Sequence, residues 1–193
     1  VLLVGPMPTP AIAHLTKSLN ADAGIVLSAS HNSSHDNGIK IFDNEGFKLS
    51  DEEELKIEHL IENNTGTCNI MGDMIGKAYR IDDAKGRYIE FAKSTIQSLS
   101  IKGIRIVLDC ANGAAYKVAP SIFTELGAHV SVLCDQPDGL NINKNCGALY
   151  PELIRREVLS RGADIGLALD GDADRIFFVD ENGNIINSSL ISS

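Results

Sequence analysis

The 193-residue sequence has few basic residues, no long apolar run and no Cys-x-x-Cys pair. It contains 17 Lys and Arg against 26 Asp and Glu, for a formal net charge of −9. This charge balance argues against a general affinity for nucleic acid or anionic membranes. No apolar run approaches the roughly 20 residues of a membrane-spanning helix, and no signal peptide opens the chain. We therefore predict a cytoplasmic protein without nucleic-acid or membrane partners.

The spacing of the four cysteines predicts neither a zinc site nor a redox pair. Cys110 and Cys134 fall at the ends of predicted strands, where we expect small buried hydrophobes. Apolar residues make up 44% of the chain, enough for real cores. The sequence opens on Val1-Leu-Leu-Val4 without an initiator methionine, and we interpret it as a piece of a longer protein.

The order of predicted elements indicates an α/β fold. From Ile104 onward, strands alternate with helices, which implies a largely parallel sheet with sites at the carboxyl ends of its strands. We predict two consecutive α/β domains, residues 1–84 and 85–193, with mixed, largely parallel sheets flanked by helices. The predicted strands are 1–4, 23–27 (buried), 39–42, 104–109, 129–133, 165–169, 175–180 and 184–186; the predicted helices are 9–19, 51–62, 82–97, 115–126 and 151–161.

Three aspartates alternate in Asp170-Gly-Asp-Ala-Asp-Arg175, between two apolar runs. Carboxylates so close together repel one another unless a cation lies among them. Ligand sets made only of oxygen atoms suit Mg²⁺, Mn²⁺ or Ca²⁺. An EF-hand loop would need glycine at its sixth position, where this chain has Arg175. The segment predicts a hard-metal site; a solvated acidic turn at a strand end is the alternative.

A second polar segment, Leu27-Ser-Ala-Ser-His-Asn32, follows the predicted strand 23–27. Serine is a weak nucleophile unless a base or a nearby positive charge activates it. A phosphorylated serine carries about −1.5 to −2 charge and three acceptor oxygens, so it would suit a metal loop arriving from elsewhere in the fold. A Ser/Asn turn without chemistry is the alternative.

Taken together, these segments resemble the α-D-phosphohexomutase family, and within it the phosphoglucosamine mutase branch. The resemblance covers nearly the whole chain, and its two main motifs occur in the family's order. The segments that carry it are 28–32 with 37–40, 170–175, and the supporting stretches 5–10, 109–113, 137–143 and 146–147.

The resemblance implies that Ser30 carries the phosphoryl group as a phosphoserine. It also implies that Asp170, Asp172 and Asp174 hold one Mg²⁺, with an oxygen of phosphorylated Ser30 as a further ligand. The branch interconverts glucosamine 6-phosphate and glucosamine 1-phosphate through a 1,6-bisphosphate. Phosphomannomutase or phosphoglucomutase activity on a phosphorylated hexose is the alternative within the family, and a metal-binding fragment without turnover is the alternative outside it.

Three further residues receive roles through the resemblance. Arg175 is expected to face the phosphate, since guanidinium binds oxyanions in a bidentate manner. Lys40 is implicated in proton transfer or phosphate contact, with a pKa lowered by neighbouring cations; an exposed strand-end lysine is the alternative. His31 is expected to be a supporting hydrogen bonder rather than the base.

The resemblance also implies a four-domain parent. This chain would hold most of domain I and all of domain II, and domains III and IV would be its covalent partners. The loops that read the sugar and grip the distal phosphate would lie in those other domains. We therefore predict that the chain folds but does not turn over substrate on its own; a homodimer stays open.

Overall fold

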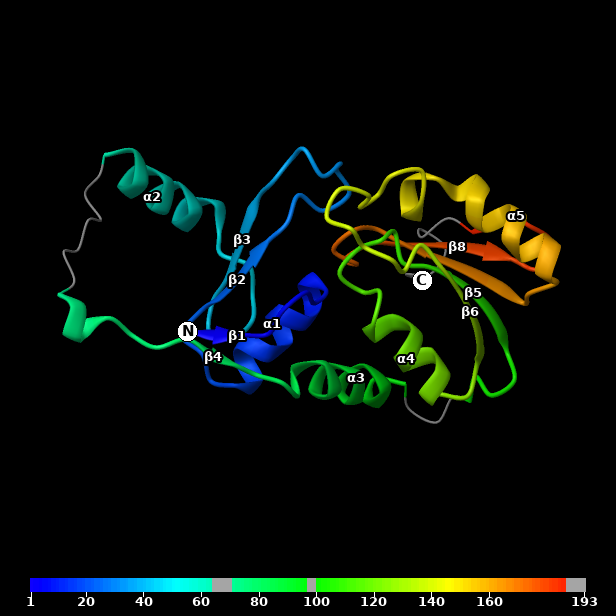
Figure 1. The fold of residues 1–193 in the computed structure, drawn as a ribbon, viewed down its shortest axis with the longest axis horizontal. Helices are drawn as coiled ribbons and strands as arrows, with labels where there is room; N and C mark the ends of the chain where they lie inside the picture. The colour runs from blue at the N-terminus through cyan, green and yellow to red at the C-terminus, as the bar shows by residue number, and fades with distance from the viewer. Residues whose placement is uncertain (64–70, 97–99, 187–193) are drawn as a thin grey trace.

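The computed structural model describes residues 1–63, 71–96 and 100–186 (Figure 1). The elements are β1 Leu2–Leu3, α1 Thr9–Ser18, β2 Gly24–Leu27, β3 Ile39–Phe42, α2 Asp51–Glu62, β4 Tyr79–Arg80, α3 Ala84–Ser94, β5 Arg105–Asp109, α4 Val118–Glu125, β6 His129–Leu133, α5 Pro151–Arg161, β7 Ile165–Leu169, β8 Ile176–Asp180 and β9 Ile185–Ile186. No helix within these ranges is both long enough and apolar enough to cross a membrane.

A five-stranded sheet with the order β6-β5-β7-β8-β9 forms the second half of the chain. β5 pairs in parallel with β6 and β7, whereas β7–β8 and β8–β9 are antiparallel. Helix α5 covers one face of this sheet and α4 the other (Figure 1). The strands predicted at 175–180 and 184–186 form the antiparallel pair β8–β9, and the mixed, helix-flanked sheet is confirmed.

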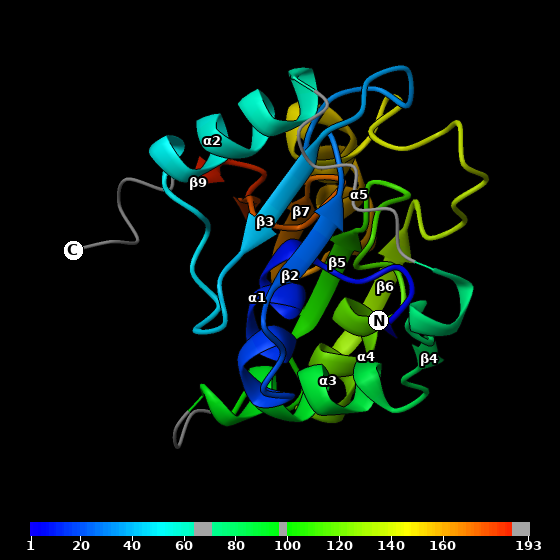
Figure 2. The same cartoon turned by 90° about the vertical axis from the view of Figure 1, so that its left-hand side faces the viewer.

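The first half contains two small sheets, β1 with β4 in parallel and β2 with β3 antiparallel (Figure 2). Helix α1 packs so closely on β2 that a Cβ on Gly24 would lie 2.0 Å from Thr16 Oγ1. The opposite face of β2 is open: Ile25 is 62% and Leu27 is 70% exposed. The prediction of a buried strand was wrong for Ile25 and Leu27, because an antiparallel pair can be covered on one face and open on the other.

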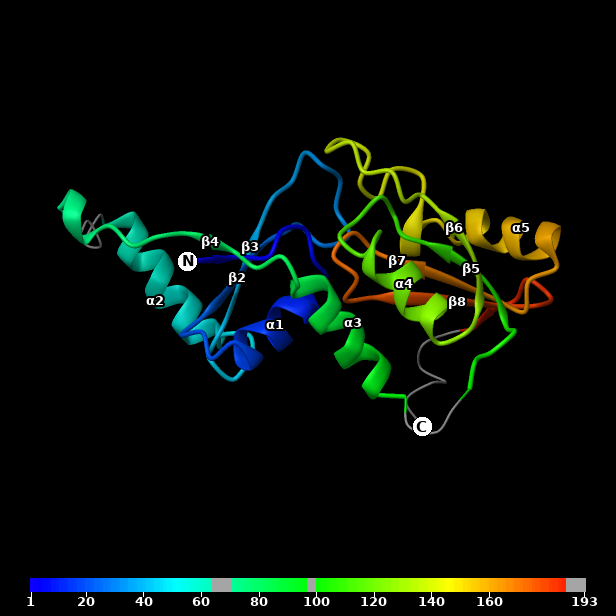
Figure 3. The same cartoon turned by 60° about the horizontal axis from the view of Figure 1, so that its bottom comes forward.

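The apolar core forms two clusters, one on each face of the large sheet. Alternate residues of β5 supply them, with Ile106 and Leu108 in one cluster and Val107 in the other. The first cluster continues into α1 and α3, which lies beside α4 (Figure 3). Apolar contacts therefore cross the predicted domain boundary near Ala84, and that boundary stays a prediction.

Several local expectations can be compared with the structure. The helices predicted at 51–62 and 151–161 have these bounds in the structure: a capping box of Ser50 and Glu53 starts α2, and Gly162 (φ 59°) ends α5. Helix α3 begins after Asp83 instead of Asp82, and its predicted end at Gln97 lies outside the described residues. Among the cysteines, Cys110 is buried as expected, whereas Cys134 is only half-buried.

Candidate functional site

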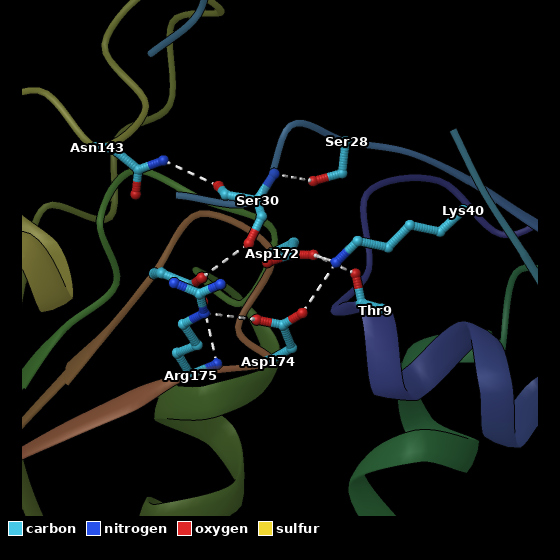
Figure 4. Close-up of polar contacts among 9 residues, drawn as sticks. Thr9, Ser28, Ser30, Lys40, Asn143, Asp172, Asp174 and Arg175 are labelled. Atoms are coloured by element: carbon cyan, nitrogen blue, oxygen red, sulfur yellow. Dashed lines mark hydrogen bonds and ion pairs between the residues drawn. The ribbon is translucent and has the colours of Figure 1, made fainter. Parts of the chain in front are cut away.

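The two polar loops singled out in the sequence meet in the structure. One follows β2 and carries Ser30; the other follows β7 and carries the three aspartates. The hydroxyl of Ser30 donates to Asp170 Oδ2 at 3.2 Å across 140 residues of sequence (Figure 4). Both loops lie at the carboxyl ends of strands, where α/β folds commonly place their sites.

Two of the three carboxylates of the aspartate loop are buried, whereas Asp174 is exposed. Asp170 is 1% and Asp172 is 2% exposed, so a solvated acidic turn is excluded for these two residues. Asp170, Asp172 and Asp174 can each offer an oxygen within 4.8 Å of the others. Burial raises the pKa of Asp170, and the negative charges of its two neighbours act in the same direction, against a hydrogen bond from the Arg175 N–H.

Lys40 reaches this loop from β3. Its Nζ donates to Asp172 Oδ2 at 2.6 Å and to Asp174 Oδ2 at 2.9 Å, and its side chain is 23% exposed. The alternative interpretation of Lys40 as an exposed lysine at a strand end is therefore wrong. Burial by itself would lower the pKa of Lys40, but hydrogen bonds and charge from the two carboxylates outweigh it and raise the pKa. The expected lowering was wrong because the neighbours of Lys40 are anions.

The donor atoms fit a hard divalent metal. Within the described part of the chain, no hydrogen-bond partner reaches Asp172 Oδ1, although this oxygen is buried. An unpaired buried carboxylate oxygen is costly unless a cation or another donor meets it. Three converging carboxylates match the all-oxygen preference of Mg²⁺, so the residues present suit that ion.

Thr9 belongs to the same cluster, although the sequence analysis gave it no role. Its hydroxyl donates to Asp172 Oδ2 at 2.6 Å, and its N–H donates to the Asp172 carbonyl at 2.9 Å. Besides Lys40, Thr9 helps keep the pKa of Asp172 low, although burial acts in the opposite direction. The available signal was its position at the start of α1, because a helix N-terminus favours a nearby negative charge.

Ser28 and Ser30 make different contacts. The alternation of side chains along a strand places both on the same face, so it could not distinguish between them. Ser28 Oγ accepts the N–H of Ser30 at 2.9 Å, and Ser30 is the residue whose hydroxyl meets Asp170. Ser30 has φ 55°, in the left-handed region that a residue with a Cβ seldom occupies. The Ser28 hydroxyl thus supports the unusual backbone of Ser30 (Figure 4).

Arg175 and His31 lie at the site without direct bonds to Ser30 among the described residues. The Arg175 side chain is largely exposed; its Nε is 3.9 Å from Asp174 Oδ1, and its N–H donates to Asp170 Oδ1 at 3.2 Å. His31 Nδ1 is buried without a partner in the described ranges. It lines a cavity of about 510 Å³ next to Asn143. The phosphate-facing role of Arg175 and the supporting role of His31 stay predictions.

Asn143 is the second residue at the site that the sequence analysis left without a role. Its Nδ2 donates to the main-chain oxygens of Ser30 at 3.0 Å and Asn32 at 2.8 Å. It lies in the 137–143 stretch, which supported the family resemblance but suggested no contact. The contact joins residues 113 positions apart, which no local pattern indicates.

Comparisons with known proteins agree with this geometry. Residues 1–67 match the profile "Phosphoglucomutase/phosphomannomutase, alpha/beta/alpha domain I", and residues 86–183 match the corresponding domain II. Proteins named phosphoglucosamine mutase from Geobacter sp. (strain M21) and Syntrophus aciditrophicus are 56% and 57% identical over 99% and 98% of the chain. The alignments span 42% and 43% of those two relatives, so the chain covers less than half of their length.

A solved structure gives the same result at lower identity. A phosphoglucomutase/phosphomannomutase family protein from Burkholderia thailandensis superposes with a TM-score of 0.82 at 26% identity, over 97% of this chain and 42% of that one. The two profile matches lie in the family's order along the sequence. The loops they contain are the two that meet at Ser30 and Asp170. This chain is a member of the phosphoglucomutase/phosphomannomutase family.

Proposed function

We propose that the full-length protein is a phosphoglucosamine mutase, an isomerase that interconverts glucosamine 6-phosphate and glucosamine 1-phosphate. The observation that carries this proposal is the contact between the Ser30 hydroxyl and the buried Asp170 carboxylate, beside Lys40. The choice of sugar rests on relatives of that name at 56% and 57% identity. Phosphomannomutase or phosphoglucomutase activity is the less favoured alternative, since the relatives at 56% and 57% identity are named phosphoglucosamine mutase.

The reaction would begin with a phosphoryl group on Ser30. The sugar O1 hydroxyl of glucosamine 6-phosphate attacks the phosphorus, the O1–P bond forms, and the bond between phosphorus and Ser30 Oγ breaks. The product is the 1,6-bisphosphate; the O1 proton passes to a general base, and Ser30 Oγ leaves as a hydroxyl after taking up a proton. After the bisphosphate has reoriented, Ser30 Oγ loses its proton and attacks the phosphorus of the 6-phosphate. The bond between phosphorus and O6 breaks, O6 takes up a proton, and glucosamine 1-phosphate is released. Ser30 is thereby phosphorylated again, and the atoms balance over one cycle.

Asp170, Asp172 and Asp174 would hold Mg²⁺, with an oxygen of the phosphorylated Ser30 as a further ligand. The bound ion would neutralise charge on the transferring phosphoryl group, which is the main assistance that such reactions receive. Thr9 fixes the Asp172 carboxylate for this task. Family membership and the acidic cluster support the metal assignment.

The cations of the site would bind the phosphate. Lys40 already lies 2.6 Å from Asp172, so its ammonium can contact both the metal loop and a phosphate on Ser30. Hydrogen bonds and charge from Asp172 and Asp174 raise the pKa of Lys40 against the effect of burial, which suits a cation that contacts a phosphate. The exposed guanidinium of Arg175 would meet the phosphate from the other loop.

The full-length protein would contain two domains besides those of this chain. The domain boundary near Ala84 is supported by profile matches that end at residue 67 and resume at residue 86. Domains III and IV would supply the contacts to the sugar and the distal phosphate, so the 193-residue chain alone would not turn over. The cytoplasmic location stays a prediction, and a homodimer stays open.

A coupled assay on the full-length protein tests this function. With glucosamine 6-phosphate, Mg²⁺ and a bisphosphate primer, we expect turnover, which Ser30→Ala reduces by at least about 10³-fold because it removes the phosphoryl carrier. Ser28→Ala is the matched control: it removes a hydroxyl that supports the backbone, and turnover should persist at a lower rate.

Phosphopeptide mass spectrometry of the wild-type protein should locate the phosphate on Ser30. A phosphate on Ser28 would contradict the assignment of the nucleophile. Faster turnover of mannose 6-phosphate or glucose 6-phosphate than of glucosamine 6-phosphate would contradict the sugar assignment and leave the phosphoserine chemistry in place.

A further inference from the structure

Asn143 joins the loop of Ser30 to the second half of the chain. Its Nδ2 donates to two main-chain oxygens, those of Ser30 and Asn32, on either side of His31 (Figure 4 shows the first bond). The residue is 7% exposed, so water competes little for these bonds. One amide group therefore holds the backbone on both sides of His31.

The bonds fall where the backbone of Ser30 needs support. Ser30 lies in the left-handed region, which is unfavourable for residues with a Cβ and persists only when surrounding contacts hold it. Ser28 Oγ accepts the Ser30 N–H, and Asn143 donates to the Ser30 carbonyl. Two side chains thus fix the two peptide groups of the residue whose Oγ meets Asp170.

The loop that presents Asn143 is anchored to the end of β5, the middle strand of the parallel part of the sheet. The buried carboxylate of Asp109 accepts the Gly147 N–H at 2.7 Å. Asn112 Oδ1 accepts the Gln136 N–H at 3.1 Å. The position of Asn143 is therefore set by the sheet that also carries the aspartate loop.

The aspartate loop touches the same point. A Cβ on Gly171 would lie 2.7 Å from Asn143 Nδ2 and 2.7 Å from the Ser30 main-chain oxygen. Three segments of the chain therefore converge around the Asn143 amide: the Ser30 loop, the 137–143 stretch and the aspartate loop. Asn143 therefore lies where the Ser30 loop and the aspartate loop approach each other.

We infer that Asn143 is a positioning residue that sets the Ser30 hydroxyl against the metal loop for phosphoryl transfer. This role rests on the proposed function, because the distance between the Ser30 hydroxyl and the metal loop matters only if a phosphoryl group is transferred there. Asn143 touches no reacting atom; it acts through the main-chain oxygens of Ser30 and Asn32. Misplacement of a reacting group by about 1 Å can cost on the order of 100-fold in rate.

The test is a single-turnover transfer from full-length protein phosphorylated on Ser30 to glucosamine 6-phosphate, measured by rapid quench. Asn143→Asp keeps the shape and tolerates the left-handed φ of 57°, but replaces the donor with an acceptor facing two carbonyls. Asn143→Gly removes the donor without adding charge and covers the case in which Asn143→Asp does not fold. Asn145→Asp is the matched control, with φ 56° in the same loop and an exposed side chain.

For both Asn143 variants we expect the transfer rate constant to fall about 10- to 100-fold, with an unchanged reaction amplitude and KM. The amplitude counts folded, phosphorylated molecules, so a merely structural defect would lower it and leave the rate constant unchanged. Asn145→Asp should transfer at the wild-type rate. Asn143 variants that transfer as fast as Asn145→Asp would overturn the inference.

Hydrogen exchange of the backbone in residues 28–34 provides a readout that does not depend on activity. Exchange should be faster in both Asn143 variants than in Asn145→Asp, because the backbone of this loop loses its support. If the wild-type protein transfers no phosphoryl group, the proposed function fails, and this readout still decides whether Asn143 holds the loop. Equal exchange in all variants would overturn the positioning role whatever the activity.

Discussion

The two apolar runs that precede the site loops look alike in sequence and differ in burial. Both 23–27 and 165–169 have five residues, contain one glycine and are followed by a polar loop. β7 is closed in between β5 and β8, with helices on both faces of the sheet, and four of its five residues are buried. β2 has one neighbour and one covered face. Burial is decided by the neighbours of a strand, which its own residues do not reveal.

This difference shapes the site. The carboxylates extend from a strand inside the large sheet, which fixes where they begin. The Ser30 loop extends from a two-stranded hairpin and relies on contacts made by the other half of the chain, Asn143 among them. The aspartate loop is thus held by the sheet, and the Ser30 loop by hydrogen bonds from the other half of the same chain.

Truncating one leucine in each region gives the largest expected effect and tests the comparison. Leu108 in β5 is 0% exposed, and Leu108→Ala should lower the free energy of unfolding by about 2–5 kcal/mol through lost burial and a cavity. Leu27 in β2 is 70% exposed, and Leu27→Ala should change it by less than about 0.5 kcal/mol. Urea unfolding of the two variants measures the difference, and equal losses would break the comparison.

Much of the fold could be predicted from sequence, because local signals placed its elements. The predicted helix ranges 51–62 and 151–161 match α2 and α5, where a capping box and a glycine mark one end of each helix. The alternation after Ile104 predicted the parallel strands. The open face of β2 could not be predicted, because a short apolar run does not indicate whether one or both faces of the strand are covered.

For the site, sequence reasoning supplied the residues and missed the support around them. Ser30 and the three aspartates stood out as unusual clusters, and the structure brings them together. Thr9 and Asn143 are common residue types whose contacts cross 163 and 113 positions. Thr9 carried one local signal, its position at the start of α1, and Asn143 carried none. The pKa direction of Lys40 was predicted wrongly because it depends on which charges the fold brings beside it.

An ion pair at the edge of the large sheet gives a smaller expected effect on stability. Arg105 at the start of β5 pairs with Asp164, just before β7, at 2.6 Å. Hydrogen bonds from Arg105 lower the pKa of Asp164 to about 2. A folded-state pKa below the unfolded value near 3.9 stabilises the protein above that value, and the gain is lost as the pH falls from about 4 towards about 2.

Asp164→Asn should therefore lower the melting temperature slightly at pH 6 and have a shrinking effect towards pH 2.5. Because both side chains are exposed, added salt should weaken the difference. Thermal melts across this pH range at low and high salt measure it, with the exposed Asp22→Asn as control. A difference that grows on acidification would have the wrong sign for this ion pair.

The central claim is that a loop from each half of the chain forms one phosphoryl-transfer site, and a paramagnetic metal tests it most directly. Mn²⁺ shares the oxygen preference of Mg²⁺ and broadens the ³¹P resonance of a phosphate that lies close to it. In full-length protein phosphorylated on Ser30, stoichiometric Mn²⁺ should broaden this resonance beyond detection. The resonance should stay sharp in the double variant Asp170→Asn, Asp172→Asn, which loses two charged ligands. A sharp resonance in the wild-type protein with Mn²⁺ bound would contradict the account.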